Sequence, residues 1–405
     1  MTVWLSAGII FTLLSVAYIL FKWGNMKVVG VTPVRTFTFI AILFTSGLDV
    51  GLIMFPLTEF AGYADISASP EYAFTNELAI ELGFWGFLIW GFYFLTCFYF
   101  CVVEPKVKFF ELPVVKFVNN VVIIGTCAFT AFLLLSNLPW YLPSIGDGES
   151  VVPAFYLIVF AAIAFAVYSS TSIKYVRILS LTTTWVFIAL IVGMWAAAFV
   201  FGESEITAYF TNLGLIGGYF ANIDNFVLPI NEYHEFYLFW WFSWSIMIGQ
   251  FTSRFVGGLK TYQVMLAMMV IPSIPIAAWF SVLYHYHSAG IPTEGITNLA
   301  MVCVGVVFVI NSLDSLIRLY TDNLNMTVER IGKGNYIALN IVALSLLTLL
   351  FKLDFLQIQW VGALVIAIFF SCFAFILSQK FKSVTAIKTS PKENKIDFTK
   401  IENLN

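Results

Sequence analysis

The chain has 405 residues, of which 60% are hydrophobic and 11% are charged, and its mean hydropathy is +0.91. These values exclude a soluble globular domain and predict an all-α polytopic membrane protein. The formal net charge of −3 is uninformative for an embedded chain, and we expect membrane lipid and a small solute as partners, and no nucleic acid.

Eleven apolar runs are each about as long as the roughly 20 residues that a membrane-spanning helix needs. They are residues 3–22, 35–56, 79–103, 117–139, 152–170, 177–201, 234–253, 262–284, 296–317, 335–351 and 358–378. The first run lacks a small-residue cleavage site, so it is interpreted as a retained helix rather than a signal peptide.

The basic residues are distributed unevenly between the two sets of alternating loops. Nineteen of the twenty lysines and arginines lie in one set and the C-terminal tail, and only Lys352 lies in the other. Basic loops remain in the cytoplasm, so we expect a multi-pass protein of the cell membrane with a cytoplasmic C-terminus. Because eleven is an odd number, the N-terminus is expected outside.

The second apolar run contains the sequence Gly47-Leu48-Asp49-Val50-Gly51 near its middle. Glycines at such a position let a helix unwind, so that backbone groups can face a ligand or an ion. A carboxylate inside the membrane is costly and usually functional. Asp49 is therefore a candidate counter-charge for a cationic substrate, a proton carrier or a metal-cation ligand, or it caps the unwound helix.

Two groups of large aromatic residues occur in the third and seventh runs. Trp85, Trp90 and Tyr93 form the first group, and on a straight helix Trp90 and Tyr93 would share a face, with Trp85 at an angle to them. The second group is Trp240, Trp241 and Trp244. Indole faces attract a cation that has no N–H to donate, such as a quaternary ammonium group. Lipid-facing or interfacial aromatic side chains are the alternative, but Trp244 lies too deep for an interfacial belt.

The remaining polar segments are less specific. Residues 203–232 predict an amphipathic helix on the outer surface, and the last 22 residues or so predict a disordered tail. Glu77 and Glu81 either attract a cation or form a solvated helix start, and His234, His285 and His287 are expected at the outer interface. No nucleophile, phosphate loop or metal cluster stands out, so we expect neither an enzyme nor a bound cofactor.

Four stretches of the chain resemble the betaine/choline/carnitine transporter family in the order in which the family has them. They are residues 237–283 with the sequence Trp-Trp-Phe-Ser-Trp-Ser, residues 45–52 together with Glu59, residues 174–180, and residues 308–315. The similarity covers roughly residues 30–380, and of the twelve helices usual in the family the first is unmatched.

The resemblance implies a LeuT-like fold of two inverted five-helix repeats plus one extra N-terminal helix. The corresponding segments are an extra helix and loop (1–30), the first repeat (31–201), the outer amphipathic helix (202–233), the second repeat (234–380) and a polar cytoplasmic tail (381–405). The oligomeric state is left open, with a homotrimer as the candidate because members of the family are often trimers.

The resemblance also implies roles for individual residues. An aromatic box around the trimethylammonium group would consist of Trp85, Trp90, Tyr93 and Trp241, with Trp240 and Trp244 along the same pathway and Gly47, Asp49 and Gly51 on the unwound helix. In sodium-coupled members a Thr-Ser pair ligates the ion, and here that pair is Asn311-Ser312, beside Phe308. The coupling ion is therefore open between Na+ and H+, the latter through Asp49.

These features predict a secondary transporter of a quaternary ammonium solute that works by alternating access. Choline is favoured over glycine betaine or carnitine, because Asp49 would repel the carboxylate of a betaine. Two alternatives stay open: a sodium-coupled amino-acid carrier of the same fold, and a membrane sensor that binds the solute without moving it.

Overall fold

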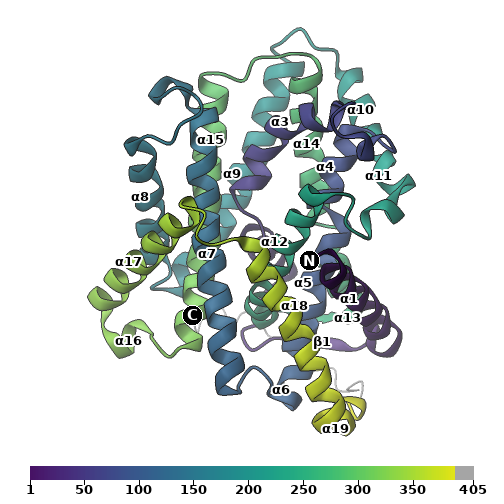
Figure 1. The fold of residues 1–405 in the computed structure, drawn as a ribbon, viewed down its shortest axis with the longest axis vertical. Helices are drawn as coiled ribbons and strands as arrows, with labels where there is room; N and C mark the ends of the chain where they lie inside the picture. Colours follow the sequence, from purple (N-terminus) through teal and green to yellow (C-terminus); the bar gives the residue numbers. More distant parts are fainter. Residues whose placement is uncertain (388–405) are drawn as a thin grey trace.

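The computed structural model describes residues 1–387, whose regular elements are helices and two short strands (Figure 1). The first half contains α1 (Thr2–Trp23), β1 (Lys27–Val29), α2 (Thr36–Ser46), α3 (Val50–Ala64), α4 (Glu77–Trp85), α5 (Trp90–Phe98), α6 (Glu104–Val107), α7 (Pro113–Tyr141), α8 (Pro153–Ser169) and α9 (Ile173–Phe199). The second half contains α10 (Ile206–Leu215), α11 (Gly217–Ala221), α12 (Glu232–Thr252), β2 (Gly257–Lys260), α13 (Thr261–Met269), α14 (Ser273–Ser288), α15 (Ile296–Asn323), α16 (Val328–Ile331), α17 (Lys333–Lys352), α18 (Ile358–Phe375) and α19 (Phe381–Thr385).

All eleven apolar runs are helical. Among the described residues, eight helices are long and apolar enough to cross a membrane, or nine if the bent pair α2 and α3 is one span. The other two runs are α8, which is shorter with 17 residues, and α12, which carries two glutamates and a histidine in its first turns. Almost every residue of α12 is buried inside the protein, so this helix needs no lipid-facing apolar surface. The class of all-α polytopic membrane protein is confirmed.

A two-stranded ribbon joins two distant loops. β1 pairs with β2 in antiparallel orientation, with Lys27 opposite Lys260 and Val28 opposite Leu259. These strands follow α1 and α12, whose loops both belong to the basic set. Because paired strands must lie side by side, the two loops lie on the same face of the protein, as the charge pattern predicts. The strands themselves were not expected from the sequence.

The long connection after α9 forms two short helices instead of the one predicted. α10 packs on α14 and α4, and α11 packs on α4. Gly218 allows α11 to pack this closely, because a Cβ at this position would lie 2.5 Å from the Thr75 hydroxyl and 2.6 Å from the Asn76 amide nitrogen. The connection is therefore held tightly against the start of α4.

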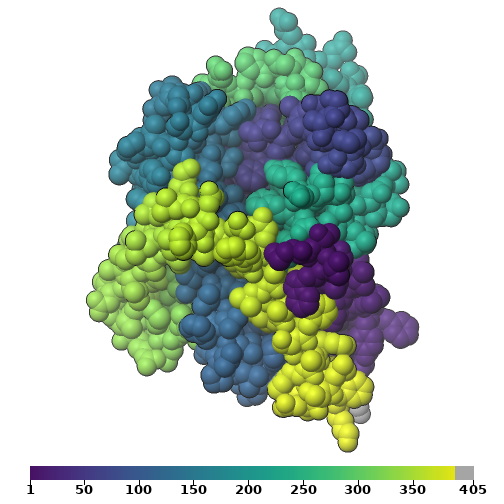
Figure 2. Space-filling model, in the orientation of Figure 1, coloured from purple at the N-terminus to yellow at the C-terminus, as the bar shows by residue number. Residues whose placement is uncertain are grey.

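The N-terminal helix α1 packs against the C-terminal helix α18. Figure 2 shows the first residues, in purple, against the C-terminal helices, in yellow. The Trp4 indole donates to the Ala363 carbonyl (3.0 Å), and α12 packs between α18 and α5. The predicted polar tail begins with α19, and the rest of it lies outside the described residues.

Candidate substrate-binding site

The second apolar run is broken at the predicted glycine segment. α2 ends at Ser46, α3 begins at Val50, and the two helices are bent by 56°. Asp49 caps α3, because its Oδ1 accepts the Gly51 backbone N–H at 2.8 Å. Its Oδ2 is buried without a hydrogen-bond partner among residues 1–387. One carboxylate oxygen thus holds the helix start and the other is free for a ligand.

Side chains from two other helices hold α3 in place. Pro56 lies inside α3 and has no N–H, so the Leu52 carbonyl loses its helical partner. The Trp279 indole donates to that carbonyl at 3.0 Å, and the Tyr141 hydroxyl donates to the Met54 carbonyl at 2.6 Å. The broken helix is therefore fixed to α14 and α7 by hydrogen bonds to its backbone.

The third run is also broken, between the two tryptophans of the first aromatic group. The interpretation as a straight helix is wrong: α4 ends at Trp85, Gly86 is extended, and α5 begins only at Trp90. Phe87 has φ of 53°, and its N–H is satisfied by the Ser273 hydroxyl at 2.8 Å. Trp90 closes the break by donating its indole N–H to the Trp85 carbonyl (3.0 Å).

The break brings the four predicted box residues together. Trp241 contacts each of the other three, with ring centroids 5.5 Å from Trp85, 5.8 Å from Tyr93 and 6.5 Å from Trp90. The Trp85 and Trp241 rings are nearly perpendicular at 88°. The Trp241 indole donates to the Phe84 carbonyl (2.8 Å) and the Tyr93 hydroxyl donates to the Gly47 carbonyl (3.1 Å). Three helices thus position these rings through their backbones.

Glycines allow the aromatic walls to touch the broken helix. A Cβ at Gly51 would lie 2.5 Å from Trp85 and 3.0 Å from Trp240, and one at Gly47 would lie 3.1 Å from Tyr93. The distance at Gly51 is too short for a carbon–carbon contact, and the distance at Gly47 would require the Tyr93 ring to shift by a few tenths of an ångström.

The other two predicted tryptophans lie beside Asp49. A cavity of about 10 Å³ is lined by Gly47, Leu48, Asp49, Trp85, Trp240, Trp241 and Trp244. The indole N–H groups of Trp85, Trp240 and Trp244 have no hydrogen-bond partner in the described part of the chain. Such a volume is at the lower limit for a single water molecule. The box is therefore closed, and its walls must separate to admit an ammonium group.

The predicted ion-coupling residues lie on α15 against the same break. Ser312 contacts the carbonyls of Thr45 and Leu48 on the broken segment, and it donates back to the Phe308 carbonyl on its own helix. Asn311 is turned toward α9, where its Oδ1 accepts from the Ser180 hydroxyl at 3.1 Å. The structure thus brings Ser312 to the unwound carbonyls and directs Asn311 away from them.

Two expectations about polar residues are wrong. Glu81 is fully buried, so it is not a solvated helix start, and its neighbours in the sequence are almost all apolar, which is the signal that indicates burial. The histidines were expected at the interface, but His234 and His285 are also buried, and His234 is stacked on Phe84 with ring centroids 4.5 Å apart. Glu81 and His234 lie near Tyr237, a further aromatic neighbour of Trp85 that the sequence did not single out.

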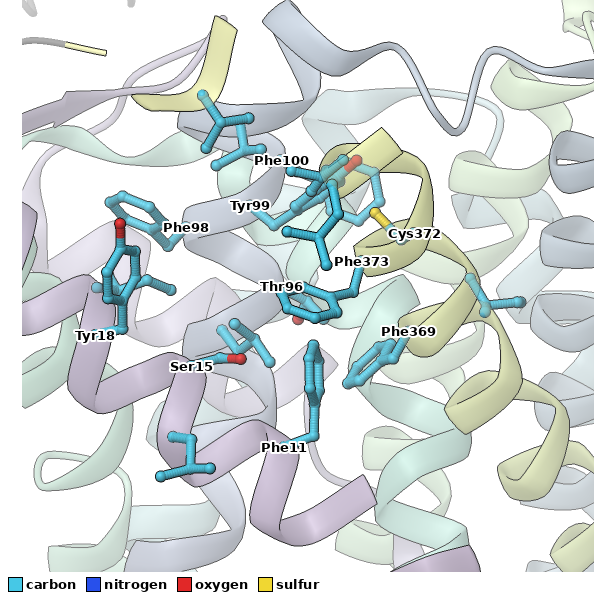
Figure 3. Close-up of a pocket in the computed structure, with 18 of the residues that line it drawn as sticks. Phe11, Ser15, Tyr18, Thr96, Phe98, Tyr99, Phe100, Phe369, Cys372 and Phe373 are labelled. Carbon is cyan, nitrogen blue, oxygen red and sulfur yellow. The ribbon is translucent and has the colours of Figure 1, made fainter. Parts of the chain in front are cut away.

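A larger cavity lies elsewhere, between α1, α5 and α18, with a volume of about 650 Å³ (Figure 3). Phe11, Phe98, Phe369 and Phe373 point into it, and its lining is almost entirely apolar. None of the predicted box residues lines it. No carboxylate is among the lining residues in the described part of the chain, so this cavity suits hydrocarbon rather than a polar cation.

Comparison with known proteins gives two relatives. The chain is 22% identical over 319 residues to glycine betaine transporter 1 of Vibrio parahaemolyticus, covering 68% of this chain and 59% of the relative. It is 25% identical over 300 residues to an uncharacterized transporter of Haemophilus influenzae, covering 64% of this chain and 44% of the relative. No protein-family model matches the chain.

The chain thus spans little more than half of the first relative and less than half of the second. Both relatives are named as transporters, and the first is named for a quaternary ammonium solute. These similarities confirm the resemblance to the betaine/choline/carnitine transporter family.

Proposed function

We propose that the protein is a secondary transporter of a quaternary ammonium solute. The observation that carries this proposal is the contact of Trp241 with Trp85, Trp90 and Tyr93 at 5.5 to 6.5 Å. Electron-rich rings on several sides stabilise a cation that has no N–H groups, each by about 2 kcal/mol when desolvated. The name of the first relative supports the same class of solute.

Choline is the favoured substrate. Asp49 supplies a negative charge beside the box, and its Oδ2 lacks a partner among the described residues. A choline hydroxyl can donate to this oxygen, and the cation is attracted to it. A betaine or carnitine would instead bring a second carboxylate next to Asp49. Two like charges repel each other strongly in a low-dielectric site.

Alternating access would use the two breaks described above. The closed box lies between α3, α4, α5 and α12, so opening it requires these helices to move relative to one another. Sodium coupling would use Ser312 with the carbonyls of Thr45 and Leu48, since hydroxyl and carbonyl oxygens suit a hard cation. Proton coupling through Asp49 is the alternative.

The direct test is uptake of labelled choline and glycine betaine by the purified protein in proteoliposomes, with sodium and pH gradients imposed separately. Choline uptake that follows one gradient supports the proposal and identifies the coupling ion. Binding without uptake indicates a sensor, and competition by a primary amine indicates an amino-acid carrier.

The aromatic box is tested by the substitution Trp241→Leu. It removes one cation–π contact of about 2 kcal/mol, so the affinity for choline should fall at least tenfold. The matched control is Trp185→Leu, because Trp185 is 60% exposed on the surface and should not affect binding. Melting temperatures show that each variant is folded, and unchanged choline affinity in Trp241→Leu would exclude the box.

A further inference from the structure

Four buried side chains and the partly exposed Tyr233 form a cluster between α3, α4 and α12, directly beside the aromatic box. This carboxyl–tyrosine cluster consists of Glu59, Tyr63, Glu81, Tyr233 and Tyr237. Glu81 is fully buried and Glu59 is 9% exposed. Two carboxyl groups in an apolar interior are costly unless a proton or a cation accompanies them.

Hydrogen-bond counting shows where a proton belongs. The Tyr63 hydroxyl lies 2.6 Å from Glu59 Oε2 and 2.9 Å from Glu81 Oε2. A phenol has one hydrogen to donate, so it can donate to only one of these carboxyl groups. Both contacts are satisfied when the other carboxyl carries a proton and donates to the Tyr63 oxygen.

The remaining contacts distinguish the two carboxyl groups. Glu59 also accepts the hydroxyls of Tyr233 and Tyr237, the latter at 2.8 Å, and three donors suit an ionised carboxylate. Glu81 Oε1 has no hydrogen-bond partner within residues 1–387. Glu81 is thus the carboxyl that carries the proton.

The cluster is connected to the box through Trp85. Glu81 precedes Trp85 by one helical turn on α4, and the Trp85 indole N–H has no hydrogen-bond partner among residues 1–387. Tyr237 packs on Trp85 and on Trp240, each with ring centroids 5.6 Å apart. A movement of Trp85 that opens the box therefore changes the surroundings of Glu81.

Within residues 1–387, three other titratable groups face the cluster. They are Tyr72 before α4, Tyr141 on α7 and His234 on α12. His234 is the only one that can become positive, but its Nδ1 accepts the Ile230 N–H (3.2 Å), which requires the neutral ring. The side chains that influence the Glu81 carboxyl by their charge or polarity are Glu59, Tyr63 and Trp85. None of these three side chains is a cation.

We propose that the carboxyl–tyrosine cluster is a proton-binding site centred on Glu81, and that a cation entering the aromatic box releases its proton. The proton site stands on the geometry alone, whereas its linkage to a ligand rests on the proposed function. Because binding and proton release are reciprocal, the affinity for the cation rises with pH. For unit charges on the order of 10 Å apart at an effective dielectric constant of about 20, the change in affinity is about tenfold.

The proton site is tested first without any ligand. Infrared difference spectra of the purified protein between low and high pH should contain a protonated-carboxyl band that is absent in Glu81→Gln. The matched control is Glu77→Gln, one turn earlier on α4, where the carboxylate accepts from the Tyr284 hydroxyl (2.9 Å). A band that persists unchanged in Glu81→Gln would overturn the proposal.

The linkage is tested by choline binding in weakly buffered solution. We expect up to about half a proton released per choline bound by the wild-type protein and by Glu77→Gln, because a roughly tenfold coupling changes the proton affinity of the site only tenfold. We expect no release by Glu81→Gln and partial recovery in Glu81→Asp. Choline binding without proton release in the wild-type protein would overturn the linkage. The linkage would also be overturned if, at constant pH, the choline affinity of the wild-type protein depended on Na+ and that of Glu81→Gln did not. Absence of choline binding would instead contradict the proposed function, while the infrared band still tests the proton site.

Discussion

At the scale of single residues, the site depends on its glycines as much as on its aromatic side chains. Gly51 lies against Trp85 and Trp240, and Gly47 lies against Tyr93. The rings approach the backbone so closely that the carbonyl of Gly47 can accept the Tyr93 hydroxyl. The geometry of the box is therefore set by contacts between rings and backbone rather than by the tryptophans alone.

The substitution Gly51→Ala should reduce choline affinity at least tenfold, because the added methyl group would lie 2.5 Å from Trp85 and displace this wall of the box. Gly62→Ala is the matched control, since it lies on the same helix and a Cβ there would meet no described atom within 4 Å. Equilibrium binding of both variants checks the prediction. Equal affinities would mean that Trp85 moves aside without consequence.

At the scale of elements, the relative position of the two aromatic groups depends on the crossing of α5, which carries Trp90 and Tyr93, with α12, which carries Trp241. Thr96 on α5 donates to the Ser245 carbonyl on α12 at 2.6 Å. Opposite Thr96 lies Gly249, where a Cβ would be 2.0 Å from the Thr96 hydroxyl and 2.6 Å from the Cys97 backbone nitrogen. Small residues at such crossings let membrane helices approach closely. This crossing therefore fixes how Trp90 and Tyr93 face Trp241.

We expect Gly249→Ala to destabilise the protein by about 1–3 kcal/mol, the usual effect of overpacking a close contact, and to lower the melting temperature in detergent. Gly193→Ala on α9 is the control, because the described structure leaves space for its Cβ and alanine favours a helix by about 1 kcal/mol. Thermal unfolding of the two variants should shift in opposite directions. A Gly249→Ala variant as stable as the wild type would contradict the close crossing.

At the scale of the whole molecule, α12 connects the main features in order across the protein. Its first turns carry Tyr233 and Tyr237 of the carboxyl–tyrosine cluster, its middle carries the three tryptophans, and β2 follows its end. The ribbon of β1 and β2 thus marks the face opposite to the cluster. From the positive-inside rule we expect the ribbon face to lie in the cytoplasm.

Labelling with a membrane-impermeant maleimide tests this orientation. In a Cys303→Ser background, which removes the exposed cysteine, we expect Glu149→Cys in intact cells to react from outside. Asn25→Cys, beside the ribbon, should react only after the membrane is opened. The opposite pattern would reverse the assignment of faces. Both positions are exposed loop residues, so access to the reagent differs only through the membrane.

The sequence by itself determined the class of protein, the eleven helical runs and the helix break at Gly47–Asp49, and its resemblance to a known family predicted the residues of the aromatic box. These features follow from local properties: backbone groups in hydrocarbon must be satisfied within a helix, glycine permits unwinding, and tryptophan is conspicuous. The tertiary structure alone decided the break between Trp85 and Trp90 and the pairing of β1 with β2. It also decided the hydrogen bond from Trp279 to α3 and the proximity of Glu59 to Glu81. Each of these depends on which faces of distant helices oppose one another, and the pattern along one helix carries no information about its neighbours.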